Sequence, residues 1–246
     1  MLMPNWRNSE LAGSLDGNSF HLWRINLNPA GYTDLVSRSD FFASDELERA
    51  KRFRFDKHRR QYLVGRKALR QILGFYLALE PQKVKFVYGE FGKPLVEQAG
   101  VSFNLSNSHE MALIGVSPFE SIGVDLEYKD RHIWDADALA KTVFTDLEQE
   151  ELSQYPKANR LIPFLSGWTR KEAYLKGIGK GLAMPLKDFS VSLDNDEPNP
   201  LISAPDWRLM SFWVSDAYLA AAAYPKGEDS PEFKWFDWDQ AYFDRI

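Results

Sequence analysis

The sequence has no cysteine and only four histidines among its 246 residues. The missing cysteine excludes disulfides, zinc–thiolate sites and thiol nucleophiles, and it is typical of a protein of the reducing cytoplasm. The scarcity of histidine argues against a multi-histidine metal site. Any metal is therefore expected on carboxylates, which are the ligands of a hard cation such as Mg²⁺.

Long apolar runs are also missing. The sequence contains no stretch of eighteen apolar residues, which is the minimum for a predicted membrane span. Residues 1–10 include Pro4, Arg7 and Asn8 and lack the apolar segment of a secretory signal. We therefore expect a cytoplasmic protein that has no membrane partner.

The charge is unevenly distributed. The net charge is −5, yet residues 49–70 hold ten Lys or Arg side chains and a single acid, Asp56. A protein that coats nucleic acid is usually basic over more of its length, so we expect no nucleic-acid partner. A compact basic segment fits either a small polyanion or a solvated helix face, and the sequence leaves both open.

Two long helices and several short strands are predicted from periodicity. Residues 59–79 and 159–177 have helical spacing, and residues 134–155 read as two helical pieces that break near Thr145. The last sixteen residues hold six aromatics and are expected to pack back on the body. With a boundary at Pro118, the prediction is an α+β protein of two similar subdomains, 1–118 and 119–246, with a cleft between them. The expected strands are residues 19–26, 83–88, 101–105, 111–116, 121–128, 189–193, 208–214 and 218–224.

Two carboxylates share one face of a predicted strand. In the segment Gly123-Val-Asp-Leu-Glu127, Asp125 and Glu127 point to the same side because side chains alternate along a strand. Carboxylates roughly 7 Å apart repel each other, and a divalent cation between them removes that repulsion. The alternative interpretation is a solvated strand face.

A second polar stripe lies on the second long helix. Trp168, Glu172 and Lys176 are spaced by four residues and therefore share one helix face, although such a Glu–Lys pair is also common on plain surfaces. Residues 103–108 read as a strand that ends in an Asn/Ser-rich turn able to donate to a phosphate. Residues 91–94 form a loop with Lys93 between Gly and Pro. Each of the last two segments alone is better explained as an ordinary turn.

Taken in order, these motifs resemble the Sfp-type 4′-phosphopantetheinyl transferase family. The resemblance covers residues 48–193 and implies two subdomains related by a pseudo-twofold axis, each with a small, mostly antiparallel sheet and a long helix. The motifs that carry it are Phe91-Gly-Lys-Pro94, Phe103-Asn-Leu-Ser106, Gly123-Val-Asp-Leu-Glu127 and Trp168-x-x-Lys171-Glu172-Ala173-x-x-Lys176.

The resemblance also implies roles for individual residues. Many family members have His where this chain has Asn107, and an amide carries no charge, so Arg59 and Arg66 are candidates to supply it. The implied magnesium ligands are Asp125, Glu127 and Glu172. The implied contacts to coenzyme A are Arg49, Arg59, Lys93, Ser106, Asn107, Lys176 and, through the metal, Asp125.

The implied reaction transfers 4′-phosphopantetheine from coenzyme A to a serine of an apo acyl or peptidyl carrier protein and releases 3′,5′-ADP. Such carriers serve fatty acid, polyketide or nonribosomal peptide synthesis. Lys176 would assist the leaving group, and Glu148 resembles the family's base, with a metal-bound water as the other candidate. We further expect a monomer, with a docking surface for the carrier near Phe144, Leu147 and Leu152.

Two other readings remain open at the level of sequence. Asp125, Glu127 and Lys129 also match part of the pattern of magnesium-dependent nucleases, so a nuclease or phosphohydrolase is the alternative enzyme. A scaffold without activity, on which these acids are surface residues, is the alternative that lacks an enzyme. Metal-dependent binding of coenzyme A would separate the transferase from both.

Overall fold

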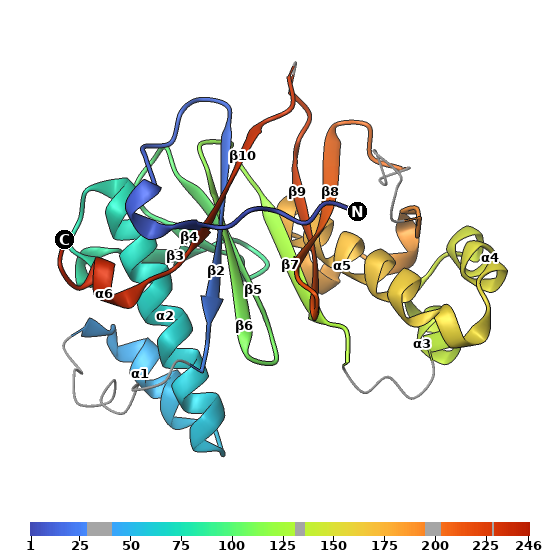
Figure 1. The fold of residues 1–246 in the computed structure, drawn as a ribbon, viewed down its shortest axis with the longest axis horizontal. Helices are drawn as coiled ribbons and strands as arrows, with labels where there is room; N and C mark the ends of the chain where they lie inside the picture. The colour runs from blue at the N-terminus through green and yellow to red at the C-terminus, as the bar shows by residue number, and fades with distance from the viewer. Residues whose placement is uncertain (29–40, 131–135, 195–202, 228) are drawn as a thin grey trace.

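The computed structural model describes residues 1–28, 41–130, 136–194, 203–227 and 229–246 (Figure 1). The helices are α1 Ser44–Lys51, α2 Asp56–Leu77, α3 Ala136–Val143, α4 Asp146–Gln154, α5 Leu161–Ile178 and α6 Gln240–Phe243. The strands are β1 Arg7–Asn8, β2 Ser19–Asn26, β3 Phe86–Tyr88, β4 Pro94–Val96, β5 Ser102–Ser108, β6 Met111–Ser117, β7 Gly123–Tyr128, β8 Trp207–Ser215, β9 Tyr218–Pro225 and β10 Glu232–Asp237. Short 3-10 turns occupy Ser9–Leu11, Pro81–Lys83, Lys157–Asn159, Gly181–Ala183 and Leu186–Asp188. In the described part of the chain no helix is both long enough and apolar enough to cross a membrane.

The two halves repeat one connectivity. In the first half the chain runs β2, α2, β5, β6, and β6 lies between β2 and β5 and is antiparallel to both. In the second half it runs β7, α5, β8, β9, and β9 lies between β7 and β8. Figure 1 shows one long helix beside each sheet, α2 in the first half and α5 in the second. This repetition confirms the expected α+β fold of two similar subdomains.

Three apolar clusters hold these layers together. One lies between α2 and the first sheet and contains Leu69, Ile72 and Leu73, as the helical periodicity predicts. A second lies between α5 and the second sheet. The third joins the two sheets, with Phe20 and Leu113 from the first packed with residues of β7, β8 and β9 from the second. Burial of large apolar side chains on both sides makes the two halves one body.

The ends of the chain cross between the halves. Strand β10 lies between β1 and β2 in the first sheet, parallel to both. Leu2 forms a bridge with Phe212 of β8 in the second sheet. Phe236 and Phe243 are buried, which confirms that the aromatic tail packs on the body. The division at residue 118 stays a prediction for the folding units, but strand pairing places residues 232–237 with the first sheet.

Three local features differ from the sequence expectations. The expected strand at 189–193 is replaced by a single bridge at Val191, since the backbone N–H groups of Val191 and Leu193 donate to the carboxylates of Glu148 and Glu151 rather than to a neighbouring strand. The expected turn after residue 105 is strand, because β5 continues to Ser108. The third difference is strand β10, Glu232–Asp237, which was not among the expected strands, whereas the two helical pieces are α3 and α4 as expected and residue 134 lies outside the described residues.

A close contact between β7 and α5 places the acidic strand against the helix. A Cβ atom at Gly123 would lie 2.0 Å from the carbonyl oxygen of Ala173 and 2.4 Å from the backbone nitrogen of Gly177, so only glycine fits there. Because Gly123 begins β7 and Ala173 follows Glu172, this approach brings the acids of β7 beside the polar stripe of α5.

Candidate active site

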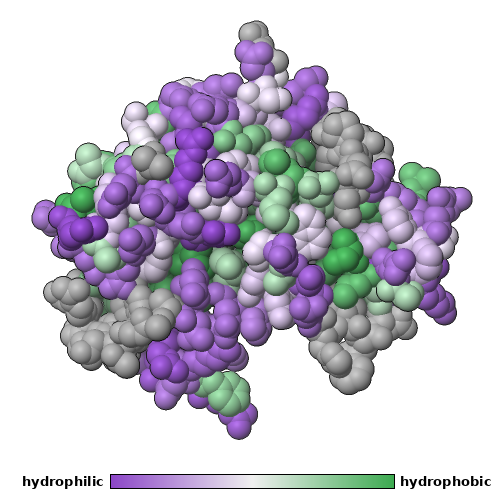
Figure 2. All heavy atoms as spheres, viewed as in Figure 1, coloured by the Kyte–Doolittle hydropathy of each residue, from purple (hydrophilic) through white to green (hydrophobic). Residues whose placement is uncertain are grey.

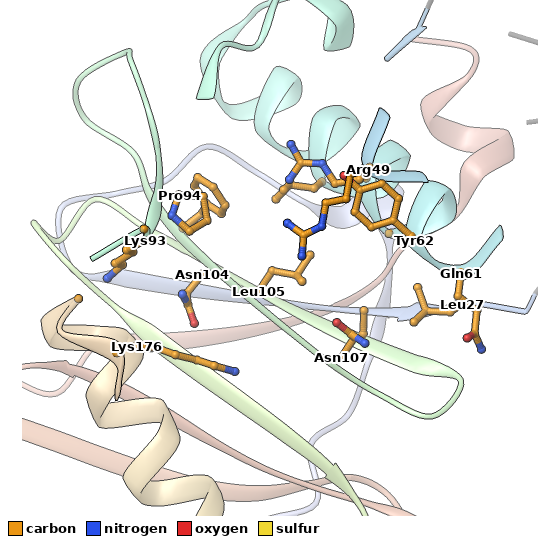
Figure 3. Close-up of a pocket in the computed structure, with 18 of the residues that line it drawn as sticks. Leu27, Arg49, Gln61, Tyr62, Lys93, Pro94, Asn104, Leu105, Asn107 and Lys176 are labelled. Carbon is orange, nitrogen blue, oxygen red and sulfur yellow. The ribbon is translucent and has the colours of Figure 1, made fainter. Parts of the chain in front are cut away.

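A cleft of about 640 Å³ lies where the two halves meet. Its wall comes from α1, α2, the loop at 91–94, strand β5 and the C-terminal end of α5. In Figure 3, Arg49 and Lys176 reach toward β5 from opposite sides. Hydrophilic residues gather over α1 and the lower part of α2 on the face shown in Figure 2. Four residues predicted from sequence to contact the ligand line this cleft: Arg49, Lys93, Asn107 and Lys176.

Asp125 is 5% exposed and does not itself line the cleft, but it bonds to Lys176, which does. Its Oδ1 accepts hydrogen bonds from the Lys176 ammonium, at 2.6 Å, and from the Ser106 hydroxyl, at 2.8 Å. Its Oδ2 is buried and has no hydrogen-bond partner among the described residues. A buried, unpartnered carboxylate oxygen is costly, so this atom is a candidate ligand for a cation.

Glu127 follows two residues later on the same face and is 8% exposed. The Trp168 indole N–H donates to its Oε1 at 3.0 Å, and the Ser108 hydroxyl donates to its Oε2 at 3.0 Å. These two bonds come from β5 and α5 and orient the side chain.

Glu172 projects from α5 toward these two acids. Burial raises the pKa of Glu172, and the negative charges of Asp125 and then Glu127 add to the rise, while Lys176 opposes it. The pKa shift shows that the three carboxylates share one electrostatic environment. Lys176, one turn along the same helix, neutralises part of this charge.

This group fits a hard divalent cation that takes its remaining ligands from water or from a bound phosphate. No three metal-ligating side chains come close enough to form a closed metal site within the described ranges. Mg²⁺ commonly binds through one or two carboxylates and takes its remaining ligands from waters and substrate phosphates. The free Oδ2 of Asp125 and the repulsion felt by Glu172 match that mode.

Lys93 ties the two halves together. Its ammonium donates to Ser121 Oγ at 2.7 Å, to the carbonyl of Ile122 at 2.9 Å and to the carbonyl of Gly177 at 2.8 Å. Burial lowers the pKa of Lys93 to about 8. All three donors of the ammonium are therefore used within the protein, and its stem lines the cleft.

The basic wall of the cleft depends on a buried acid. Arg66 stacks on the Phe86 ring, with 4.3 Å from its guanidinium carbon to the ring centroid, and is ion-paired with Glu46. Glu46 is 2% exposed and also accepts from Arg70 at 2.8 Å. Arg59 instead pairs with Asp56 at 3.0 Å and does not line the cleft.

One curated relative matches nearly the whole chain. The chain is 39% identical over 237 residues to "4′-phosphopantetheinyl transferase HetI" of Nostoc sp., which covers 95% of this chain and 99% of that protein. The chain belongs to the 4′-phosphopantetheinyl transferase superfamily. The model of this superfamily matches residues 121–223, and the model "4′-phosphopantetheinyl transferase, N-terminal" matches residues 31–118. The chain is also 29% identical over 199 residues to "4′-phosphopantetheinyl transferase Sfp" of Bacillus subtilis, with 78% and 85% covered. These matches do not support the nuclease alternative.

Glu148 of this transferase is not brought to the other acids. It is 1% exposed and pairs with Lys171 at 2.8 Å. It also accepts the backbone N–H groups of Thr145, at 2.7 Å, and Val191, at 2.8 Å. Thr145 is the N-cap of α4, as its sequence predicts, and Glu148 completes its capping box. These contacts describe a carboxylate that fixes the start of α4.

The expected carrier surface is only partly exposed in the transferase. Phe144 and Leu152 are buried in the core beside α5, so these two residues were wrongly expected at a surface. Leu147 is 66% exposed, and Leu139 on α3 is 43% exposed. The periodicity of the short helix α4 did not reveal which apolar side chains face inward.

Several functional side chains of the transferase were missed in the sequence. Asn104 and Ser108 bond to β7, Trp168 orients Glu127, and Glu46 holds the basic wall. One signal was available: Asn104, Ser106 and Ser108 alternate along β5, as polar residues on one side of a strand do. Because a turn was predicted after residue 105, the strand was ended too early for this alternation to be recognised.

Proposed function

We propose that this chain transfers the 4′-phosphopantetheine group of coenzyme A to a serine of an apo carrier protein and releases 3′,5′-ADP. The observation that carries the proposal is the group of Asp125, Glu172 and Lys176, whose lysine lines a cleft with a basic wall. A cleft of about 640 Å³ has the size of a cofactor pocket.

Asp125, Glu127 and Glu172 would hold Mg²⁺, with Asp125 Oδ2 as the ligand that has no other partner in the described part of the chain. When bound, Mg²⁺ neutralises charge on the pyrophosphate oxygens of coenzyme A. The other proposed contacts are those of Arg49 and Arg66 to the nucleotide end of the ligand. Because these cations stand on α1 and α2 and the acids on β7 and α5, the ligand would span both halves.

The residues of the chain contribute mainly position and charge to the reaction. The serine oxygen forms a bond to the β-phosphorus while the bond to the bridging oxygen breaks, and 3′,5′-ADP leaves with that electron pair. Lys176, held by Asp125, would donate to the oxygen that gains charge. A water molecule, the other candidate base, would accept the serine proton, because the oxygens of Glu148 are engaged by Lys171, Thr145 and Val191.

For the partner we propose a small acidic carrier protein and a monomeric enzyme in the cytoplasm. Exposed Leu139 and Leu147 lie on α3 and α4, and the ammonium of Lys187 donates to the carbonyl of Lys141 at the end of α3. This apolar and basic surface suits an acidic helix. Leu147→Asp is expected to weaken carrier affinity, and unchanged affinity would contradict this docking surface.

The decisive experiment follows transfer of a fluorescent phosphopantetheine from labelled coenzyme A to purified apo carrier proteins. Wild type and Glu172→Ala are compared with magnesium and with excess EDTA. Glu150→Ala, which removes an exposed acid from α4, is the matched control. The proposal expects labelling that requires magnesium, is lost in Glu172→Ala and persists in the control. Folded wild type that labels no fatty acid, polyketide or peptide carrier would overturn it.

A further inference from the structure

The seam between the two sheets is closed by side chains. Strand β5 is the edge of the first sheet, strand β7 is the edge of the second, and the two are not paired. The outward N–H groups of β7 nevertheless find acceptors, as edge groups must when buried. The three rungs run from Val124 N–H to Asn104 Oδ1 at 2.8 Å, from Leu126 N–H to Ser106 Oγ at 3.3 Å and from Tyr128 N–H to Ser108 Oγ at 3.1 Å.

The middle rung also belongs to the active site. Ser106 Oγ donates to Asp125 Oδ1 at 2.8 Å and accepts from the Lys176 ammonium at 2.9 Å, besides the N–H of Leu126. A hydroxyl group has one donor and two acceptor sites. All three are therefore used by the protein, and Ser106 is 6% exposed. The hydroxyl has no donor left for a phosphate oxygen.

The same arrangement decides which oxygen of Asp125 is available. Ser106 and Lys176 both bond to Oδ1, which fixes the carboxylate by two donors from different elements, β5 and α5. Oδ2 is buried and keeps no partner among the residues that the structure describes. The orientation of Asp125 therefore depends on Ser106, a residue of the other half of the molecule.

We infer that Ser106 is a positioning residue of the transferase: its hydroxyl fixes Asp125 and Lys176 and so presents Asp125 Oδ2 to the cation, and it does not itself bind phosphate. The inference rests on the proposed function for its catalytic meaning. It replaces the phosphate contact that the sequence suggested for Ser106, and it makes the β5–β7 seam part of the catalytic geometry.

Three variants test this role. Ser106→Ala removes the hydroxyl, and Ser106→Thr keeps it. Ser102→Ala is the matched control, because Ser102 lies on β5 with the same alternation and bonds to the carbonyl of Glu120 at 2.8 Å, away from the acids. A thermal unfolding curve of each variant reports whether it folds. Ser106→Thr keeps the test interpretable if loss of the rung unfolds Ser106→Ala.

The first readout is binding of coenzyme A by calorimetry, in EDTA and across a magnesium titration. If Ser106 has a positioning role, Ser106→Ala should bind coenzyme A in EDTA with an affinity within about twofold of wild type. The magnesium concentration that gives half of the effect on binding should rise about 10- to 100-fold, which is the usual effect of losing a residue that orients a metal ligand. Transfer at fixed magnesium then falls mainly in kcat, and Ser106→Thr restores both. Weaker metal-free binding with an unchanged magnesium requirement would instead make Ser106 a direct phosphate contact and overturn the inference.

The second readout needs neither coenzyme A nor a carrier, so it separates this inference from the proposed function. Magnesium chloride alone should raise the Tm of wild type, Ser106→Thr and Ser102→Ala, and raise that of Ser106→Ala much less. If wild type shows this shift but transfers nothing, the proposed function fails and the inference stands. If the four proteins respond alike, or wild type does not respond, the inference fails.

Discussion

Helix α5 carries two lysine–carboxylate pairs that differ in their surroundings. Lys171 pairs with Glu148 at 2.8 Å, and the two side chains are 0% and 1% exposed. Lys176 pairs with Asp125 at 2.6 Å, and these side chains are 28% and 6% exposed. The lysines are five residues apart on one helix, so the helix alone does not decide what each pair does.

The difference lies in which hydrogen-bonding sites remain. The Lys171 ammonium donates to the carbonyls of Leu186 and Phe189 as well as to Glu148, so every donor is used. The second pair leaves Oδ2 of Asp125 without a partner among the described residues, and its lysine lines the cleft. We call Lys171–Glu148 the closed pair, because its donors are all used and it stabilises the fold. We call Lys176–Asp125 the open pair, because it remains available to a ligand.

The largest expected effect comes from breaking the closed pair. Glu148→Ala leaves Lys171 buried without its counter-charge and removes the acceptor of the Val191 N–H. Loss of one partner of a buried pair costs about 3–5 kcal/mol. We expect the free energy of unfolding in urea to fall by that amount, with a loss of activity that follows the folded fraction.

The control replaces both charges with apolar side chains. Glu148→Leu combined with Lys171→Met leaves no unpaired charge, so much of the stability should return. If Glu148→Ala instead keeps its stability and loses transfer by orders of magnitude, Glu148 is the base that the sequence suggested.

Breaking the open pair should affect activity more than stability. Lys176→Met keeps the length of the side chain and removes the donors to Asp125 and Ser106. We expect kcat/KM for transfer to fall about 100-fold, which is about 2.7 kcal/mol, as for loss of one preorganised donor. Lys157→Met, at an exposed lysine, is the control. A fall confined to KM for the carrier would mean that Lys176 does not act on the reacting phosphate.

The two pairs also show which features of the fold and of the site could be predicted from the sequence. The alternation of Asp125 with Glu127, and the spacing of Glu172 and Lys176, follow from local geometry, so sequence could place these side chains on one face of β7 and one face of α5, while their role in binding a metal stays a prediction. The two long helices and the repeated halves followed from periodicity in the same way.

What sequence did not show are bonds between distant segments. The partners of Lys93 lie 28, 29 and 84 residues away, and those of Glu46 lie 20 and 24 residues away. Local propensity carries no information on such pairing. The same limit applies to Glu148, whose role as the base stays a prediction, because an acid in the first turn of a helix is equally typical of a cap, an ion pair or a catalytic group.

An effect of intermediate size is expected at Lys93, whose ammonium joins the two halves. Lys93→Met removes the donors to Ser121 and to the carbonyls of Ile122 and Gly177, and we expect a loss of about 1–3 kcal/mol in urea unfolding. The pKa of Lys93 is about 8 in the folded protein, below the ordinary 10.5. The unfolded chain therefore binds more protons between these values, so the stability of wild type relative to the variant should rise with pH from about 8 to 10.5.

A difference between wild type and Lys93→Met that does not vary with pH would contradict this account. Unchanged stability together with weaker binding of coenzyme A would support the phosphate contact that the sequence predicted for Lys93.

The smallest expected effect concerns Glu172 and tests whether the open pair is kept at a cost to stability. Burial and the charge of Asp125 raise the pKa of Glu172 above 4.5. The folded protein therefore binds the proton more tightly than the unfolded chain, and stability falls as pH rises through the window between 4.5 and the raised pKa.

Glu172→Gln has no charge to lose and should not show this fall. In EDTA we expect its stability relative to wild type to increase as pH rises through that window and to remain higher at neutral pH, as measured by urea unfolding. Magnesium should then stabilise wild type more than the variant, because binding of the cation favours the ionised carboxylate. Parallel pH profiles in EDTA would show that the acids do not repel one another in the folded state. If wild type is less stable than Glu172→Gln in EDTA but more stable than it in magnesium, then Glu172 lowers the stability of the free enzyme and the cation reverses this loss.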